Sequence, residues 1–157
     1  MFKGLVYLAL IVILLRNIEF WNGFLDLFNR EVVGFSLSRF HNRWLVIGAL
    51  EDALGHNDAS GIVHSDQGSE YASTDFTQFV ELAGSRVSMS EKGSPWQNGH
   101  QESFFGHFKL EAGDLNQFDD LGELVEYIYQ QIYYYNYERI HSALKMTPVE
   151  YRKRHTV

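Results

Sequence analysis

The stretch IVHSDQGSEYASTDFTQFVELAGSRVSMSEKGSPWQNGHQESFFGHFKLE, residues 62–111, contains two acidic residues in very different settings. Asp66 follows a short β-branched run and comes just before a glycine, which predicts a carboxylate at the exit of a buried strand. Open α/β sheets place their sites at such strand ends. Glu102 lies in a segment whose apolar residues predict a helix packed against the sheet.

These two carboxylates suggest a metal site. Thirty-five residues lie between Asp66 and Glu102 in the sequence. A strand-end Asp and a helix Glu could converge in space, because Mg²⁺ and Mn²⁺ prefer one or two carboxylates and take their other oxygen ligands from substrate phosphate. We therefore expect a site for Mg²⁺ or Mn²⁺ that uses both side chains.

Three fragments in order carry a family resemblance: HSDQGSEY (residues 64–71), SPWQNGHQESFFGHFKLE (residues 94–111) and YYYNYERIHSALKMTPVEY (residues 133–151). Together they resemble the integrase core of bacterial insertion-element transposases, relatives of retroviral integrase. The resemblance covers residues 24–151. It implies an α/β fold of the ribonuclease H type, a mixed sheet flanked by helices.

The resemblance also implies a chemistry. In this family three acidic residues, two Asp and one Glu, bind two metal ions that drive DNA strand cleavage and strand transfer. By the resemblance, Asp66 is the second Asp and Glu102 is the Glu, and both are catalytic residues and metal ligands. The partners that it implies are DNA, both transposon ends and target, and other copies of the chain or an intact transposase.

Composition limits the alternatives. The 157 residues suffice for one domain, 45% of them are apolar and none is cysteine. The seven histidines show no HExxH or other paired ligand spacing, so we reject a zinc site. The net charge of −7 argues against a surface that is basic throughout, although a local patch or an attached domain could still hold phosphate.

The N-terminal part departs from the family pattern. The apolar run at residues 4–15 is too short for a membrane-spanning helix and precedes no cleavage site. We expect a buried central strand, no membrane association and a cytoplasmic protein. We divide the chain into an atypical apolar segment, residues 1–23, and a core-like domain, residues 24–157. Residues 4–9 match the family strand GxxYLA, which predicts that the preceding strand is missing or altered and that the chain is N-terminally truncated.

The same departure affects the first catalytic Asp. In the family this residue lies on the strand before GxxYLA, and no residue of this sequence stands at that place. Asp26 is the nearest acidic candidate. The interpretation that we favour for Asp26 is a carboxylate at a turn or strand end, and the alternative is a substitute metal ligand.

Five further residues are candidates for DNA binding. Ser94, Trp96 and Asn98 lie in a Gly/Pro-punctuated loop, where Trp96 could stack on a base or anchor the loop to the core. Lys109 follows Glu102 by seven residues on the same helix face and could neutralise a phosphate or remain solvated. Arg139 belongs to a segment that resembles the family signature YNxxRxHxxL.

Hydrophobic periodicity and turn residues predict the other elements. They are a strand over residues 32–38, a helix over 42–54 capped by His41 or Asn42, a strand over 62–64, a helix that begins at residues 73–75, an edge strand over 86–89, a long helix over 118–143 with a possible break, and a terminal helix capped by Thr147 with Pro148 in its first position.

Taken together, these features predict transposase-type DNA cleavage and strand transfer, with the activity of this chain impaired by loss of the first Asp. One alternative is an inactive DNA-binding or oligomerising partner of an intact transposase. Another is the product of a decayed element.

Overall fold

The computed structural model describes residues 6–15, 19–91, 99–113, 118 and 120–156. Five strands form one sheet in the order β3-β2-β1-β4-β5. The strands are β1 (Val6–Leu15), β2 (Glu19–Asp26), β3 (Val32–Ser38), β4 (Ile62–Ser65) and β5 (Arg86–Met89). Strand β2 pairs antiparallel with β1 and with β3, whereas β4 runs parallel to β1 and β5 runs parallel to β4. The predicted mixed sheet is confirmed.

Strand β1 takes the central place in this sheet, as the apolar run predicted. It pairs with β2 on one side and with β4 on the other. Residues 6–15 and 19–23 therefore contribute to the same sheet as the later strands. The structure places residues 6–15 in the first strand of the sheet and residues 19–26 in the second, whereas the match of residues 4–9 to GxxYLA predicted a strand that follows a missing or altered one. The first strand is present, and what is altered is its sequence.

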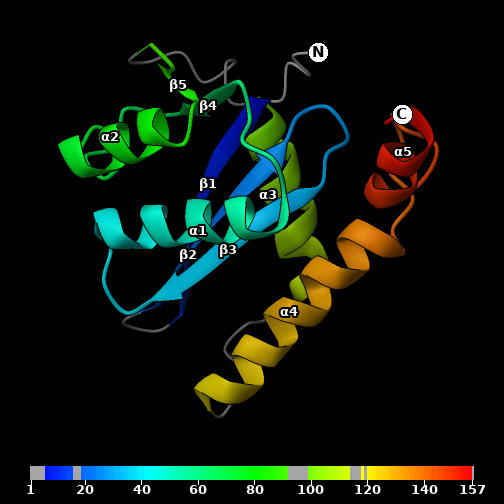
Figure 1. The fold of residues 1–157 in the computed structure, drawn as a ribbon. Helices are drawn as coiled ribbons and strands as arrows, with labels where there is room; N and C mark the ends of the chain where they lie inside the picture. The colour runs from blue at the N-terminus through cyan, green and yellow to red at the C-terminus, as the bar shows by residue number, and fades with distance from the viewer. Residues whose placement is uncertain (1–5, 16–18, 92–98, 114–117, 119, 157) are drawn as a thin grey trace.

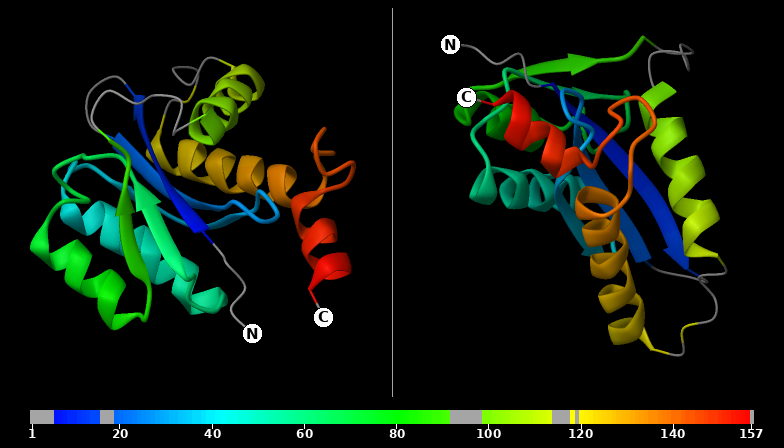
Figure 2. Two further views of the ribbon diagram at one scale, coloured as in Figure 1. Left: turned by 90° about the horizontal axis from the view of Figure 1, so that it is seen from above. Right: turned by 90° about the vertical axis from the view of Figure 1, so that its right-hand side faces the viewer.

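Helices cover both faces of the sheet. They are α1 (Arg43–His56), α2 (Thr74–Leu82), α3 (Gly99–Ala112), α4 (Leu121–Tyr137) and α5 (Pro148–His155). Helices α1 and α2 lie on one face, and α3 and α4 lie on the other (Figures 1 and 2). Side chains of Asn42, Ser73, Asp120 and Thr147 accept backbone N–H bonds at the first turns of four helices.

The alternation of β2 side chains builds a core on each face. Trp21 and Leu25 belong to the cluster under α3 and α4, whereas Phe24 belongs to the cluster under α1 and α2. Trp21 and Phe24 are completely buried. Because successive strand residues point to opposite faces, one strand supplies both cores.

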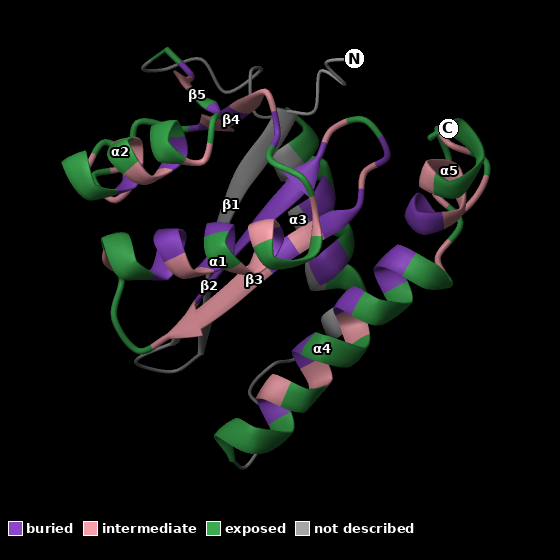
Figure 3. Ribbon diagram, in the orientation of Figure 1, coloured by how far each residue is buried: buried purple, intermediate pink, exposed green. Residues whose placement is uncertain are grey.

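The long helix is shorter than predicted. Helix α4 ends at Tyr137, and the chain then turns through a bridge between His141 and Met146 before α5 begins. Lys145 takes a positive φ of 59°, which no helix allows. Figure 3 shows that much of the outer surface of α4 is exposed. No helix among the described residues is long and apolar enough to cross a membrane.

Gly34 marks the closest approach between β3 and α1. A Cβ at this position would lie 2.2 Å from the backbone nitrogen of Ala53 and 2.7 Å from the carbonyl oxygen of Ala49. We expect Gly34→Ala to lower the free energy of unfolding by about 3 kcal/mol, since strand and helix must separate. Gly55→Ala is the matched control, because a Cβ there meets nothing within 4 Å. Urea denaturation of both variants checks this, and equal midpoints would contradict it.

Candidate active site

Asp66 lies directly after the last residue of β4, as predicted, and is exposed. Its Oδ1 accepts a hydrogen bond from the backbone N–H of Gly68 at 2.8 Å. The carbonyl of Gly68 in turn accepts from the N–H groups of Tyr71 and Ala72. A Cβ at residue 68 would lie 2.9 Å from that Oδ1, so a larger residue there would push the Asp66 carboxylate aside. The sequence Asp-x-Gly thus fixes the carboxylate at the strand exit.

A buried pair attaches this turn to the sheet. The hydroxyl of Tyr71 accepts a hydrogen bond from Nδ2 of Asn22 in β2, and both side chains are buried. Burial raises the pKa of Tyr71 well above its usual value. The hydrogen bond from Asn22 lowers this pKa in part, and the negative charges of Asp66 and Glu70 raise it further. Tyr71 therefore stays neutral and anchors the Asp66 turn.

The register of the sheet identifies the position on β1 that lies beside Asp66. Leu8 pairs with His64 in the parallel ladder, so two more residues bring residue 10 level with Asp66. Residue 10 pairs with Gly23 of β2, between Trp21 and Leu25 of the cluster under α3. Strand β1, VYLALIVILL, contains no acidic residue.

Glu102 lies in the first half of α3. Phe104 and Phe108 of this helix stack on Trp21 with ring centroids 5.9 Å away in each case. Trp21 pairs with Val12 of β1. Val12 comes two residues after residue 10, the position beside Asp66, so Trp21 lies about 7 Å further along the strand direction than Asp66. Helix α3 is thus docked over the part of the sheet to which Asp66 belongs. The side chain of Glu102 lies outside the described residues, so its convergence with Asp66 stays a prediction.

The candidates for DNA binding are described only in part. Ser94, Trp96 and Asn98 lie outside the described residues, as does the side chain of Lys109. Arg139 is described. Its Nε donates to Oε1 of Glu111 at 2.8 Å, and its guanidinium lies 5.8 Å from the ring centroid of Tyr135. Arg139 therefore joins the end of α4 to the end of α3.

Asp26 occupies a different place from Asp66. Asp26 pairs with Tyr7 of β1, three residues before residue 10, which lies beside Asp66. Strand β1 lies between β2 and β4, so two strand spacings separate the strands that carry Asp26 and Asp66. Asp26 and Asp66 are thus separated by about 10 Å along the strands and about 10 Å across them. Oδ1 of Asp26 accepts from the N–H of Phe28 at 2.8 Å, which supports the turn interpretation over a substitute ligand.

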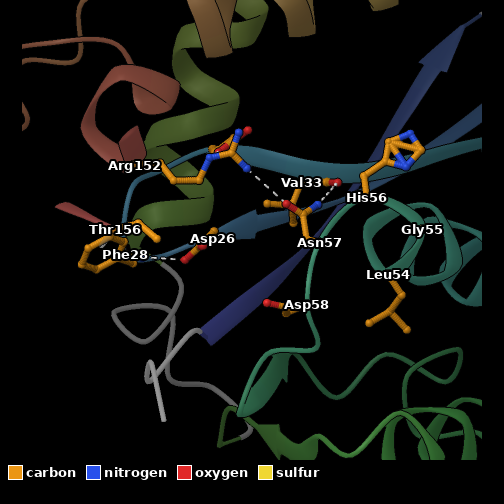
Figure 4. Close-up of a pocket in the computed structure, with 11 residues that line it drawn as sticks. Asp26, Phe28, Val33, Leu54, Gly55, His56, Asn57, Asp58, Arg152 and Thr156 are labelled. Carbon is orange, nitrogen blue, oxygen red and sulfur yellow. Dashed lines mark hydrogen bonds and ion pairs between the residues drawn. The ribbon is translucent and has the colours of Figure 1, made fainter. Parts of the chain in front are cut away.

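Asp26 lines a pocket of about 470 Å³ between the β2–β3 turn, the end of α1 and α5 (Figure 4). Arg152 from α5 pairs with Glu31 at 3.3 Å and donates to Asn57 at 3.3 Å. Burial raises the pKa of Asp26 to about 6, opposed by the Phe28 N–H and assisted by the charge of Glu31. Burial also raises the pKa of Glu31. Arg152, a member of the basic C-terminal run, therefore ties α5 to the sheet.

The donor set fits a metal ion only in part. Among the described residues no group of three or more His, Asp or Glu side chains could hold a metal. Asp66 supplies one accessible carboxylate, α3 carries a second, and the strand position level with Asp66 is leucine. Two carboxylates suit one hard cation, whereas a pair of cations needs additional carboxylate ligands.

Comparisons with known families agree with this architecture. A family model described as Integrase core domain matches residues 22–95, and a second model with the same description matches residues 83–148.

Curated relatives match most of this chain. An uncharacterized transposase-like protein of Haemophilus influenzae is 36% identical over 129 residues, which cover 81% of this chain and 60% of that protein. The putative transposase for insertion sequence element IS150 of Escherichia coli is 37% identical over 82% of this chain and 46% of its own length. The chain thus spans about half the length of the relatives that it matches.

Solved structures share the fold at low sequence identity. A chain of the simian T-cell lymphotropic virus intasome, in complex with PP2A regulatory subunit B56 gamma, superposes with a TM-score of 0.81 at 16% identity, covering 99% of this chain and 56% of that one. The HTLV-2 integrase catalytic core domain in complex with magnesium gives 0.67 at 13% identity, covering 96% and 97%. The ribonuclease H-like fold is therefore confirmed.

The raised pKa of Asp26 makes stability depend on pH. The folded state holds this proton more tightly than the unfolded state, whose pKa is near 3.8, so stability falls as pH rises from about 4 to about 6. We expect Asp26→Asn to raise the free energy of unfolding by about 2 kcal/mol at pH 7 and by almost nothing at pH 3. Urea titrations at both pH values measure this.

Glu81→Gln serves as the control, since Glu81 is exposed at the end of α2 and loses the same unit of charge. If both variants had the same increase in the free energy of unfolding at pH 7, the increase would come from the change in overall charge and not from the burial of Asp26.

Proposed function

Since this chain belongs to the integrase core domain family, we propose that it forms the core of an insertion-element transposase that acts on phosphodiester bonds of DNA. Asp66 and Glu102 serve in this proposal as catalytic residues and ligands of Mg²⁺ or Mn²⁺. The HTLV-2 neighbour was solved with magnesium, which supports a divalent cation of this kind. DNA cleavage and strand transfer are the reactions that the family relatives suggest.

The observation that carries the proposal is the placement of the Asp66 turn. Asn22 and Tyr71 hold this turn beside the central strand, and Phe104 docks α3 over the same part of the sheet through Trp21. A strand-exit carboxylate and a carboxylate on the covering helix then need only a short reach to share one cation.

A divalent cation at this place supplies Lewis-acid stabilisation of charge on a phosphodiester. The residues of the chain do the positioning. The Gly68 N–H orients Asp66, and the neutral Tyr71 hydroxyl keeps the turn from moving relative to β2. Catalysis that depends on such positioning falls steeply when one ligand is lost. We infer that strand transfer by this chain alone is impaired, because residue 10 is leucine.

A second candidate function follows from the same observation. A core without the third carboxylate could serve as a DNA-binding or oligomerising partner of an intact transposase. The exposed tyrosines on the outer side of α4 favour this, since Tyr129, Tyr133 and Tyr137 are 58%, 57% and 48% exposed. Large exposed aromatic patches commonly mark contact surfaces.

The direct test uses Mn²⁺. We expect the wild type to bind Mn²⁺ weakly and Asp66→Asn to lose binding by about tenfold, measured by electron paramagnetic resonance of free Mn²⁺. Cleavage of DNA ends should be close to background in both. Asp75→Asn, which removes a surface carboxylate at the start of α2, is the control and should bind as the wild type.

Leu10→Asp places a carboxylate at the position level with Asp66. It should tighten Mn²⁺ binding by tenfold or more and raise cleavage above background, and Asp66→Asn should cancel both gains. Strong cleavage by the unaltered chain would refute the inferred impairment. Equal Mn²⁺ binding by wild type and Asp66→Asn would refute the proposed site.

A further inference from the structure

Five basic side chains from three separate segments lie close enough together beside α3 for their charges to interact. They are Arg30 in the β2–β3 turn, His100 and His107 in α3, and Arg139 and His141 just after α4. We propose that this basic cluster is a binding site for a phosphate group, and in the context of the proposed function, on which this assignment of the ligand rests, for a phosphate of the DNA backbone.

A buried hydrogen-bonded pair brings the first and last segments together. Oδ1 of Asn136 accepts from the N–H of Val32 at 2.9 Å, and its Nδ2 donates to the carbonyl of Val32, also at 2.9 Å. Asn136 is buried, so this double contact is shielded from water. Arg30 precedes Val32 by two residues, and Arg139 follows Asn136 by three. The pair therefore fixes the turn against the end of α4.

An aromatic contact adds α3 to the cluster. The ring of Phe104 meets the ring of Tyr135 edge-on, with centroids 5.0 Å apart. His100 precedes Phe104 by four residues and His107 follows it by three, and such positions share one face of a helix. Since Arg139 lies over the same Tyr135 ring, both histidines lie on the helix face that points to Arg139.

Two side-chain nitrogens in this cluster are buried and unused. Among the atoms of the described residues, Nη1 of Arg30 and Nδ1 of His141 are enclosed without a hydrogen-bond partner. Unsatisfied buried donors are costly and rare, so their presence in one cluster calls for an acceptor that is supplied from outside. The guanidinium of Arg30 can only donate, so the group that satisfies it is a hydrogen-bond acceptor and not a metal ion, and the positive charge of the cluster favours an acceptor that is an anion.

The charges of the cluster point the same way. Burial lowers the pKa of His141, and the positive charges of Arg139, Arg30, His107 and His100 lower it further. Two carboxylates among the described residues act on these groups, since Glu111 pairs with Arg139 and the charge of Asp26 interacts with that of Arg30. A bound anion would offset the mutual repulsion of the cluster and raise the pKa of His141.

Phosphate is the anion that this arrangement suits best. Donors approach from the turn, from α3 and from the segment after α4, and a tetrahedral phosphate accepts hydrogen bonds from several sides. His100 is the second residue of the helix that also carries Glu102.

The test compares three variants in EDTA, so that the metal site plays no part. Arg30→Gln and His141→Gln each remove one unused donor, and Arg86→Gln removes an exposed arginine at the sheet edge as the control. Fluorescence anisotropy with a short single-stranded DNA should show roughly tenfold weaker binding for the first two variants and a salt dependence reduced by about one charge. Arg86→Gln should bind as the wild type.

A second arm uses inorganic phosphate and the imidazole resonances of His141 in NMR titrations. An upward shift of the His141 pKa with phosphate supports the site, and Arg30→Lys should retain part of that shift if Arg30→Gln folds poorly. Phosphate binding without DNA binding would assign the site to a free phosphate ligand.

The proposal is overturned if phosphate leaves the pKa of His141 unchanged and if Arg30→Gln, His141→Gln and Arg86→Gln all bind DNA with the same affinity. The DNA-binding measurements are made in EDTA and the Mn²⁺-binding measurements are made without DNA, so failure of the metal site and failure of the basic cluster give different results.

Discussion

The pairing of β1 with β2 on one side and β4 on the other is the constraint on which this structure depends. An apolar strand in the centre of a mixed sheet connects an antiparallel half to a parallel half. The register of the β1–β4 ladder then determines what lies beside Asp66, and the register of β1 with β2 determines where α3 docks through Trp21. Central strands satisfy their backbone hydrogen bonds on both edges, so this pairing does not depend on which apolar side chains β1 carries.

This constraint separates the fold from the chemistry. A sheet centre requires apolar residues that pair well, and VYLALIVILL meets that requirement better than a strand carrying a buried carboxylate would. A metal centre requires charge at that same place. The chain therefore retains the scaffold of an integrase core, while its first strand carries no acidic residue.

Charge is distributed unevenly over the molecule. The chain carries a net charge of −7, yet Arg30, His100, His107, Arg139 and His141 form one basic cluster next to α3. The acidic groups Asp26 and Glu31 lie instead in the pocket closed by Arg152, on the side of the β2–β3 turn where α5 packs. Nucleic-acid contact in a protein of this composition depends on such local patches and not on overall charge.

The sequence by itself determined the family, the element types and the place of Asp66 at a strand exit, because hydrophobic period, caps and the Asp-x-Gly turn are local properties. It also indicated that Asp26 is a turn carboxylate. Only the tertiary structure decided that residues 6–15 fill the first strand, that Asn22 and Tyr71 hold the Asp66 turn, and that Val32, two residues after Arg30, is bonded to Asn136 at the end of α4. These facts depend on strand register and on contacts between residues 49 to 104 positions apart, and no local pattern encodes such contacts.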